Sequence, residues 1–483
     1  MDTAVIAGGS VAGLATALAL AEAGYRVRVL ERAAPPPEGP AGSAVAGWRR
    51  PTVPQSHHSH TLTSLGVRVL RERAPQVLHA ALEAGGTLLD LTTAAPRADG
   101  GFSREPADAE LAALAIRRSV LDLVLYRVVR ADPRIEISHG VTVRHLVLDG
   151  SRRRVRGVVD AGGRHLAADV VVDAGGRRGL ARSWLADAGV PVAEDLSSPS
   201  GLRGFSRFYR LTGTAAPAPL NRGNAAGGVW DHYAGVLHPG DNHTFAIALA
   251  VLPDDATMTA LRHPAGFTVA ASASPYVAPW VAEGVSEPLG PVEAITCPPN
   301  VLRGVATRRQ EPVAGLFSVG DAACVTNPLF GRGLSLALTQ AFQLADMLGA
   351  APAVDETLSA QVAAAAEDLL RPWYEQSAQA DADRIAAWSA AVAGEPPRRP
   401  GPRVPAGRPS FHEVAAAASA DGHVWRGLTR MLMSLETPAK VFGDTLFRER
   451  VASARPRPAP AAARPPARDA LAAAVTAAKG AGR

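Results

Sequence analysis

Residues 4–13 read Ala-Val-Ile-Ala-Gly-Gly-Ser-Val-Ala-Gly and join an apolar run to an Ala- and Leu-rich segment. The apolar run predicts a short buried strand over 4–7, and the segment 11–23, closed by Gly24, predicts a helix. Alternating apolar positions at 26–30 predict the next strand. This strand, helix and strand form a compact unit whose glycine turn brings backbone N–H groups and a helix N-terminus to one point.

The glycine turn departs from the usual G-x-G-x-x-G pattern at one position, where Ser10 replaces the second glycine. Serine is small enough to let a phosphate approach the backbone, and Gly13 still permits close packing of the helix on the strand. Glu31 ends the second strand, where a carboxylate accepts hydrogen bonds from the hydroxyls of an adenosine ribose. Because an acid disfavours a 2′-phosphate there, the pattern predicts FAD or NAD in preference to NADP.

A second glycine-bearing segment lies far along the chain. Residues 316–335 read Leu-Phe-Ser-Val-Gly-Asp-Ala-Ala-Cys-Val-Thr-Asn-Pro-Leu-Phe-Gly-Arg-Gly-Leu-Ser. They predict a short strand that ends at Gly320 and Asp321, followed by a long apolar helix over 333–348. The N-terminus of that helix carries partial positive charge and therefore favours a bound group that becomes negative on reduction.

This segment resembles the Gly-Asp motif followed by P-x-x-G-x-G of the flavin monooxygenase and flavin-dependent halogenase families. The resemblance implies that Asp321 binds the ribityl chain or a nearby phosphate. It also implies that Gly331, Gly333 and Leu334 bring backbone close to the flavin ring. We therefore expect an FAD-dependent oxidoreductase.

Three other segments resemble the same group of FAD monooxygenases. Residues 55–60, Gln-Ser-His-His-Ser-His, resemble its Q-x-x-H-x-H segment, and 118–121, Arg-Ser-Val-Leu, resemble an R-x-x-L helix start that contacts the cofactor. Residues 173–177, Asp-Ala-Gly-Gly-Arg, resemble its D-x-x-G-R loop. A helix-capping or ordinary polar role explains His58 and His60 equally well. No acid or cysteine nearby completes a metal shell, so no metal is predicted.

The predicted cofactor-binding residues come from the two glycine turns, the end of the second strand and the helix start at residue 118. They are Gly8, Ser10, Ala12, Gly13, Glu31, Arg32, Arg118, Asp321, Gly331, Gly333 and Leu334. Catalytic residues are not assigned, because a flavin carries out the difficult step itself and the protein supplies orientation and electrostatics.

The expected fold class is α/β, with a discontinuous Rossmann-like FAD-binding domain, an inserted antiparallel-sheet substrate domain and a C-terminal helical region. Period-two alternation between about residues 202 and 252 predicts the antiparallel sheet. The FAD-binding domain is assigned to 1–75, 105–190 and 295–350, the substrate domain to 76–104 and 191–294, the helical region to 351–450, and a disordered tail to 451–483. The Ala, Pro and Arg composition of that tail predicts that it builds no core.

The leading hypothesis for function is a monooxygenase. In it, reduced FAD reacts with O2 to give a C4a-hydroperoxide that hydroxylates or epoxidises a mostly apolar small molecule. The alternative is a reductase or non-redox cyclase of a prenyl-type substrate, because one scaffold serves these reactions. Halogenation is less favoured, since halogenases rely on a lysine in the N-terminal half and carry W-x-W-x-I-P, whereas the first lysine here is Lys440. A flavin-free scaffold is disfavoured by the intact glycine motifs.

Two departures from the family pattern bear on how the flavin is reduced and used. Cys324 stands where hydroxylases often have His, and Arg332 stands where Gln is common. The chain has no second nucleotide-binding glycine motif, so transient NAD(P)H and a separate flavin reductase both stay open as the reductant. We interpret Cys324 as a small packing residue. The identity of the substrate and the oligomeric state do not follow from the sequence.

Composition narrows the function classes further. The 483 residues are 47% hydrophobic and 20% charged, which is typical of a globular protein. The net charge of +5 arises after Gly394, and no basic stripe interleaved with aromatics predicts nucleic-acid binding. Two cysteines and the lack of a basic segment before the first apolar run predict a cytoplasmic protein without a signal peptide. No apolar window long enough for a membrane span is expected.

Overall fold

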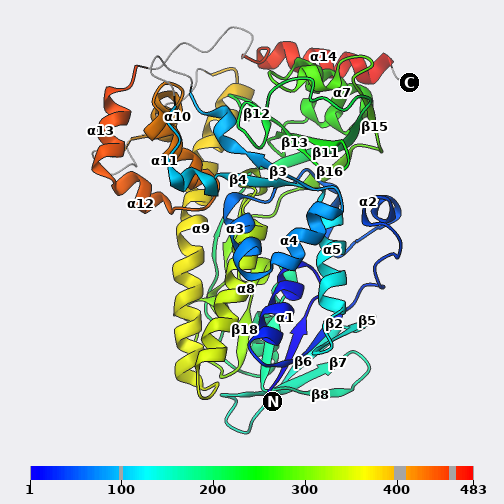
Figure 1. Ribbon diagram of the computed structural model, residues 1–483, viewed down its shortest axis with the longest axis vertical. Coiled ribbons are helices and arrows are strands. Elements are labelled where there is room, and N and C mark those ends of the chain that lie inside the picture. Colours follow the sequence, from blue (N-terminus) through cyan, green and yellow to red (C-terminus); the bar gives the residue numbers. More distant parts are fainter. Residues whose placement is uncertain (1, 97–101, 396–408, 456–463, 482–483) are drawn as a thin grey trace.

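The computed structural model describes residues 2–96, 102–395, 409–455 and 464–481 (Figure 1). Within them lies a five-stranded parallel sheet in the order β18-β9-β1-β2-β5. Its strands are β1 (Thr3–Ala7), β2 (Arg26–Glu31), β5 (Ile135–His139), β9 (Val170–Asp173) and β18 (Leu316–Ser318). Strands from distant parts of the sequence thus meet in one sheet, which confirms the Rossmann-like fold and its discontinuous character.

Helices cover one face of the parallel sheet. They include α1 (Val11–Glu22), α5 (Arg118–Arg130) and α8 (Gly333–Ala350), and α1 packs directly on α8. Alternate strand residues such as Ile6 and Val172 belong to this helical core, whereas their neighbours Val5 and Val171 belong to a second cluster on the opposite face. Burial on both faces explains the unbroken apolar strands of the sequence.

An antiparallel meander covers that opposite face. It consists of β6 (Val143–Leu148), β7 (Val155–Asp160) and β8 (His165–Ala167), with α6 (Leu180–Asp187) alongside. The other elements of this half and of its junction with the upper half are α2 (Ala41–Ala44), α3 (Ser64–Arg73), α4 (Pro75–Glu83), β3 (Thr87–Asp90), β4 (Ala112–Ala115), β10 (Leu196–Ser198), β17 (Asn300–Leu302) and β19 (Cys324–Val325).

A larger antiparallel sheet forms the upper half of the molecule in Figure 1. Its order is β12-β13-β14-β11-β15, and a further strand, β16 (Glu293–Thr296), pairs with β11. The strands are β11 (Arg203–Leu211), β12 (Ala226–Val229), β13 (Ala234–Pro239), β14 (Thr244–Val251) and β15 (Ser286–Pro288). The antiparallel sheet predicted from the period-two alternation of the sequence is therefore confirmed.

The two faces of the upper sheet differ in side-chain size. Cross-strand register places Ser206, Ala248 and Val236 side by side, and Phe208, Ala246 and His238 in the next row on the same face. The opposite face carries large apolar residues that form a separate core with α7 (Pro264–Ala273): Phe205, Tyr209, Leu237, Phe245, Ile247 and Leu249. The first face, here called the small-residue face, carries Ser206, Ala246 and Ala248 at its centre, and the opposite face is a packed core.

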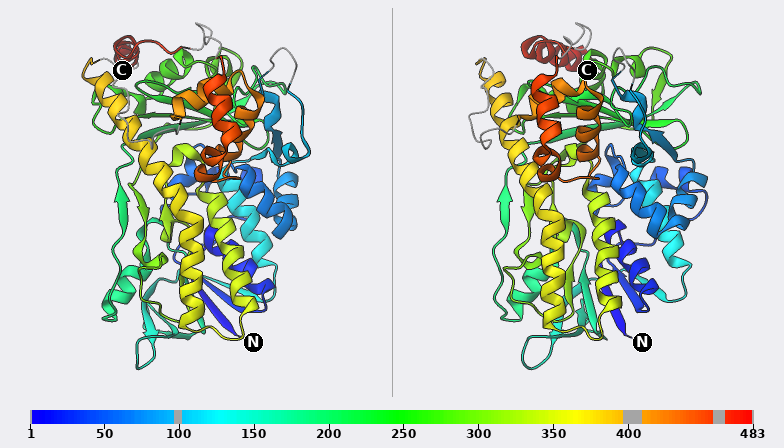
Figure 2. Two further views of the ribbon diagram at one scale, coloured as in Figure 1. Left: turned by 90° about the vertical axis from the view of Figure 1, so that its left-hand side faces the viewer. Right: turned by 60° about the vertical axis from the view of Figure 1, so that its left-hand side comes forward.

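A long helix, α9 (Glu356–Val392), runs beside both halves of the molecule (Figure 2). Asp355 caps its first turn by accepting a hydrogen bond from Leu358 N at 2.8 Å. Shorter helices follow it: α10 (Phe411–Ala418), α11 (Gly422–Leu432), α12 (Pro438–Gly443) and α13 (Thr445–Ser453). Among the described residues, no helix combines the length and apolar character that a membrane crossing requires. The assignment of residue ranges to domains stays a prediction.

The C-terminal segment is helical where a disordered tail was predicted. Helix α14 (Arg468–Ala481) packs on α7, with Leu471, Ala472 and Val475 buried in the core of the upper sheet. Arg468 also pairs with Asp255 at 3.0 Å. The prediction from residue 451 onward is therefore wrong for this helix, because alanine-rich composition concealed one narrow apolar stripe.

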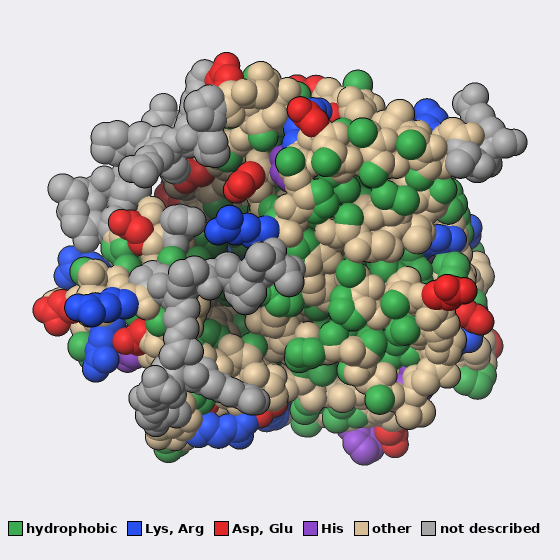
Figure 3. All heavy atoms as spheres, turned by 90° about the horizontal axis from the view of Figure 1, so that it is seen from above, with side chains coloured by type: hydrophobic (Ala, Val, Ile, Leu, Met, Phe, Trp, Pro, Cys, Tyr) green, Lys and Arg blue, Asp and Glu red, His purple; other side chains and the backbone are tan. Residues whose placement is uncertain are grey.

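The outer side of α14 contributes to an end face with few charged side chains over its right-hand half (Figure 3). Exposed alanines at Ala473, Ala474 and Ala477 fit this description. The contrast between exposed alanines and the buried Leu471 and Val475 makes α14 an amphipathic helix held by a small contact. Its attachment can therefore be tested with single substitutions.

Val475→Asp should release α14 from the upper sheet, because it places an unpaired carboxylate in an apolar core. Tryptic cleavage after Arg468, measured by mass spectrometry, should accelerate on the order of tenfold or more. Ala474→Asp introduces the same charge on the exposed side of the helix and should cleave at the wild-type rate. Equal cleavage rates in the two variants would contradict the packed helix.

Candidate functional site

The turn after β1 has no room for side chains at two glycines. Gly8 has φ +121°, and a Cβ added there would lie 2.3 Å from the carbonyl oxygen of Ala174. A Cβ at Gly13 would lie 1.9 Å from the carbonyl oxygen of Gly8. Both contacts are far inside van der Waals range, so the turn requires glycine at each position. It delivers the N-terminus of α1 to the carboxyl edge of the sheet, where anions bind in folds of this type.

Glu31 is fixed beside this turn. Its carboxylate accepts hydrogen bonds from Gly9 N at 2.6 Å and from Ala33 N at 2.8 Å. Arg118, at the start of α5, donates to Ser10 Oγ at 3.2 Å and pairs with Asp122 at 2.6 Å. An acid and a guanidinium therefore flank the turn on defined sides.

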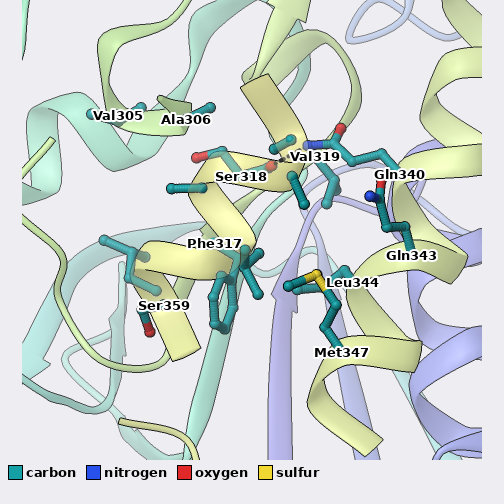
Figure 4. A pocket seen from close by; sticks show the side chains of 15 residues that line it. Val305, Ala306, Phe317, Ser318, Val319, Gln340, Gln343, Leu344, Met347 and Ser359 are labelled. Atoms are coloured by element: carbon teal, nitrogen blue, oxygen red, sulfur yellow. Dashed lines mark hydrogen bonds between the residues drawn. The ribbon is translucent and has the colours of Figure 1, made fainter. Parts of the chain in front are cut away.

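The second glycine turn lies directly against the first helix. Gly320 has φ +61°, and a Cβ there would approach the Cβ of Ala12 to 2.7 Å. Gln340 of α8 holds the turn by accepting from Gly320 N and donating to the carbonyl oxygen of Ser318, each at 2.9 Å (Figure 4). The two motifs, distant in sequence, are thus brought together at one edge of the sheet.

Asp321 follows Gly320 in this turn and lies close to the N-terminus of α8 in space. A Cβ at Gly333 would lie 4.0 Å from Asp321 Oδ1, and Arg177 Nε lies 3.9 Å from Asp321 Oδ2. Burial raises the pKa of Asp321, while the positive charges of Arg177 and Arg118 oppose that rise. Gly331, with φ +64°, makes the left-handed turn that precedes the helix.

The loop after β9 supplies Arg177. Asp173 is fully buried and accepts from Gly175 N at 2.8 Å and Ala181 N at 2.7 Å. These bonds close the loop over the strand end and carry Arg177 toward Asp321. The D-x-x-G-R pattern therefore has a structural cause in the carboxylate of Asp173.

A buried polar network anchors the loop that leads to Gly331. Asp381 of α9 accepts from Asn300 Nδ2 at 2.7 Å, and it also accepts from Asn327 Nδ2. Asn327 in turn donates its backbone N–H to Asn300 Oδ1 at 2.7 Å. Sequence analysis missed these residues, because isolated Asn and Asp side chains carry no motif. Their bonds fix the cofactor-side loop to α9.

Most of the predicted cofactor-binding residues border this one region. Arg32 is exposed, and no side-chain hydrogen bond of Arg32 is present among the described residues. The side chain of Leu334, in the first turn of α8, is buried in the helical core. The structure brings together Gly8, Ser10, Ala12, Gly13, Glu31, Arg118, Asp321, Gly331 and Gly333.

Neutral histidines lie between the glycine turns and the upper sheet. Ser59 Oγ lies 2.9 Å from His238 Nδ1, and Ser59 N donates to Ser206 Oγ at 3.5 Å. Burial lowers the pKa of His58 to about 4 and the pKa values of His60 and His238 to about 3. Nearby positive charges contribute to these shifts in the pKa, and burial is the larger cause. These imidazoles are uncharged near neutral pH, and sequence reasoning missed His238 because it sits on an ordinary strand.

Several aromatic and charged residues of the upper sheet lie on its core side. Tyr209 stacks on Phe245 with ring centroids 5.2 Å apart, and Tyr233 OH lies 3.0 Å from Ser274 Oγ. Arg207 and Tyr209 are two residues apart on β11, so both lie on the face opposite the small-residue face. The small-residue face, with Ser206 and His238, is the one directed at the glycine turns.

Arg332 and Cys324 do not form a redox or anion pair. The Arg332 guanidinium lies between the rings of Phe330, at 4.3 Å, and Trp373, at 4.8 Å. Burial lowers its pKa to about 9. Burial raises the pKa of the Cys324 thiol to about 12, so it stays protonated. This agrees with a packing role for Cys324.

The cavity of Figure 4 lies elsewhere, between β18, α8 and α9. Its lining is apolar or amide and hydroxyl in character, with Phe317, Met347, Gln340, Gln343 and Ser359 among the residues drawn. No titratable side chain lines it, so it lacks the chemistry of an active site. Within the described ranges, no cluster of three or more His, Cys, Asp or Glu is placed to hold a metal ion.

Comparison with known proteins bears on the fold. No protein-family model matches the chain. Protein Rv3254 of Mycobacterium tuberculosis is 28% identical over 379 residues, which cover 71% of this chain and 72% of that protein. PqsL, a probable FAD-dependent monooxygenase from Pseudomonas aeruginosa, superimposes with a TM-score of 0.54 and 18% identity, covering 80% of this chain and 96% of PqsL.

A variant of Klebsiella pneumoniae HpxO complexed with FAD gives a TM-score of 0.56 at 14% identity, covering 94% of this chain and 99% of that structure. The flavin-dependent brominase Bmp2 also gives 0.56, at 16% identity, covering 93% and 98%. The fold is that of the FAD-dependent monooxygenases. The resemblance seen in the sequence, including the relation to halogenases, is thereby confirmed at the level of fold.

The low pKa values of the buried histidines predict that the free energy of unfolding depends on pH. Because His238 has a lower pKa in the folded chain than its usual 6.5, the unfolded chain binds more protons below about pH 6.5. The free energy of unfolding should therefore fall on acidification, by up to about 1.4 kcal/mol per pH unit for each such histidine. Urea unfolding from pH 7 to 4.5 should give a shallower slope for His238→Asn than for wild type. Exposed His165→Asn should keep the wild-type slope, and an unchanged slope in His238→Asn would refute this account.

Proposed function

We propose that the chain is an FAD-dependent monooxygenase that inserts oxygen from O2 into a small organic substrate. The observation that carries the proposal is the contact of the Gly320 turn with Ala12 at the start of α1. This contact puts two glycine turns side by side at one edge of the sheet. One turn is of the kind that binds a pyrophosphate, and the other is of the kind that binds a flavin. The shared fold supports this reading without specifying the reaction.

The residues at this edge fit FAD. Gly8 and Gly13 allow the tight turn that a pyrophosphate site needs, because Cβ atoms there would collide with backbone carbonyl oxygens, and Glu31 is held where ribose hydroxyls would donate to it. At the other end, Gly333 is exposed at the N-terminus of α8 beside Asp321. When bound, FAD supplies the electron transfer to O2 that the side chains of the chain do not provide.

The residues of the chain would bind the cofactor, orient it and shield it from water. The first N–H groups of α1 and the guanidinium of Arg118 would hold the phosphates of FAD, and Glu31 would hold the adenosine ribose. Asp321 would accept a hydrogen bond from the ribityl chain, and the dipole of α8 would stabilise negative charge near Gly333.

The substrate lies on the small-residue face of the upper sheet. Ser206, Ala246 and Ala248 leave space there, and His238 offers a neutral hydrogen-bonding group without a charge to solvate. Reducing equivalents come from NAD(P)H directly or from a separate flavin reductase. Steady-state oxidation of NADH and NADPH by purified holoprotein, with and without added reductase, separates these two sources.

Oxygen insertion is tested by isotope labelling. Reduced holoprotein incubated with a metabolite extract under 18O2 should yield products that carry one 18O atom. Products that form equally without O2 would instead establish reductase or non-redox cyclase chemistry. A purified chain that is colourless and takes up no flavin would remove the basis of the proposal.

Asp321→Asn should weaken FAD binding by about tenfold or more, since a charge-assisted hydrogen bond becomes a neutral one. The thermal midpoint of the apoprotein should stay the same or rise, because burial already disfavours the ionised carboxylate. Flavin fluorescence titration and apoprotein melting measure the two effects. Exposed Asp187→Asn is the matched control, with wild-type affinity expected. Wild-type FAD affinity in Asp321→Asn would refute the role.

A further inference from the structure

Arg332 lies between the two glycines that precede and begin α8. Gly331, with φ +64°, comes before it, and Gly333, the first residue of α8, is exposed. Arg332 itself is only 1% exposed and is among the largest fully buried side chains of the described residues. Its backbone therefore belongs to the turn that borders the cofactor site, whereas its guanidinium lies inside the protein.

The guanidinium of Arg332 contacts uncharged groups. It lies over the rings of Phe330, at 4.3 Å, and Trp373 of α9, at 4.8 Å, and its Nη1 donates to Gln376 Oε1. Aromatic faces stabilise a cation through their quadrupole, and they carry no net charge that would cancel it. Nε and Nη2 of Arg332 are buried and have no hydrogen-bond partner among the described residues.

Two acids border the same loop, and each has another arginine beside it. Asp381, which binds Asn327, pairs with Arg384 at 3.0 Å, and Arg177 lies 3.9 Å from Asp321. In the part of the chain that the structure describes, no carboxylate forms an ion pair with Arg332. Because arginine stays protonated in proteins, one positive charge beside the start of α8 is left without a countercharge.

A buried charge of this kind is unfavourable for the protein alone. It becomes favourable beside a group that gains negative charge, because the protein interior screens the attraction less than water does. The positive end of the α8 dipole lies at the same residues and acts in the same direction. The arrangement therefore favours a cofactor that becomes negative when it is reduced.

We propose that the buried positive charge of Arg332 raises the midpoint potential of the bound flavin, because it stabilises the negative charge that reduction adds. This inference rests on the proposed function and deepens it, since it names a residue that controls how readily an external donor reduces the cofactor. Arg332 acts through its charge from inside the protein, and the backbone of Gly331 and Gly333 makes the contact with the cofactor.

Removal of the charge tests the proposal. Arg332→Gln should shift the two-electron equilibrium of bound FAD toward the oxidised form by about tenfold, which is a midpoint potential about 30 mV more negative. The potential is measured on holoprotein by stepwise reduction together with a reference dye. Arg73→Gln is the matched control, because Arg73 also lies over a ring of α8, that of Phe342, but pairs with the exposed Asp346. This control should keep the wild-type potential.

Gln376→Glu separates the effect of charge from the geometry of the loop. Glutamate keeps an acceptor for Arg332 Nη1 and puts a carboxylate beside the guanidinium, so the loop keeps its anchor while the charge is cancelled. The potential should fall about as far as in Arg332→Gln. If Arg332 only held the loop in place, Gln376→Glu would have the wild-type potential. The same variant decides the question if Arg332→Gln loses its flavin.

A wild-type potential in Gln376→Glu, or in Arg332→Gln that retains FAD, overturns the inference. Failure of the proposed function has a different signature. A wild-type chain that binds no FAD refutes the proposed function and this inference together. Lowered potentials in the variants of a chain that forms no 18O-labelled product refute oxygen insertion alone and support the role of Arg332.

Discussion

The close approach of Gly320 to Ala12 is the contact on which the rest of the site depends. It leaves no room for a side chain at residue 320, and it joins the turn after β18 to the helix after β1. Gln340 locks this arrangement through hydrogen bonds to both sides of the turn. One edge of the parallel sheet thereby carries a phosphate cradle and a second helix N-terminus in a fixed relation.

Charged side chains gather near the glycine turns, whereas the histidines toward the upper sheet are uncharged. Near the glycine turns, Arg118, Arg177 and Asp321 form a polar and partly charged surface. Toward the upper sheet, the imidazoles of His60, in the loop before α3, and His238, on β13, are neutral because burial and neighbouring positive charges disfavour protonation. A charged cofactor side facing a nearly neutral substrate side suits a reaction that must exclude water.

The sequence predicted the elements that depend on local chemistry. Glycine positions, the acid at the end of β2 and the helix over 333–348 follow from turn geometry and apolar spacing, and the structure has them within two residues. The face of each upper strand could not be predicted, because alternation separates two faces without saying which one meets the cofactor side. Tyr209 lies on the core face of the upper sheet, and His238 lies on the face toward the cofactor side.

Residues without a motif were beyond prediction for a related reason. Asp381 binds Asn300 and Asn327, which are distant from it in sequence, and the contact residues of α14 are concealed in an alanine-rich composition. The most direct test of the account is a crystal structure of the chain reconstituted with FAD. The account predicts the pyrophosphate at the first N–H groups of α1 and the isoalloxazine ring beside Gly333. FAD bound at another location would contradict it.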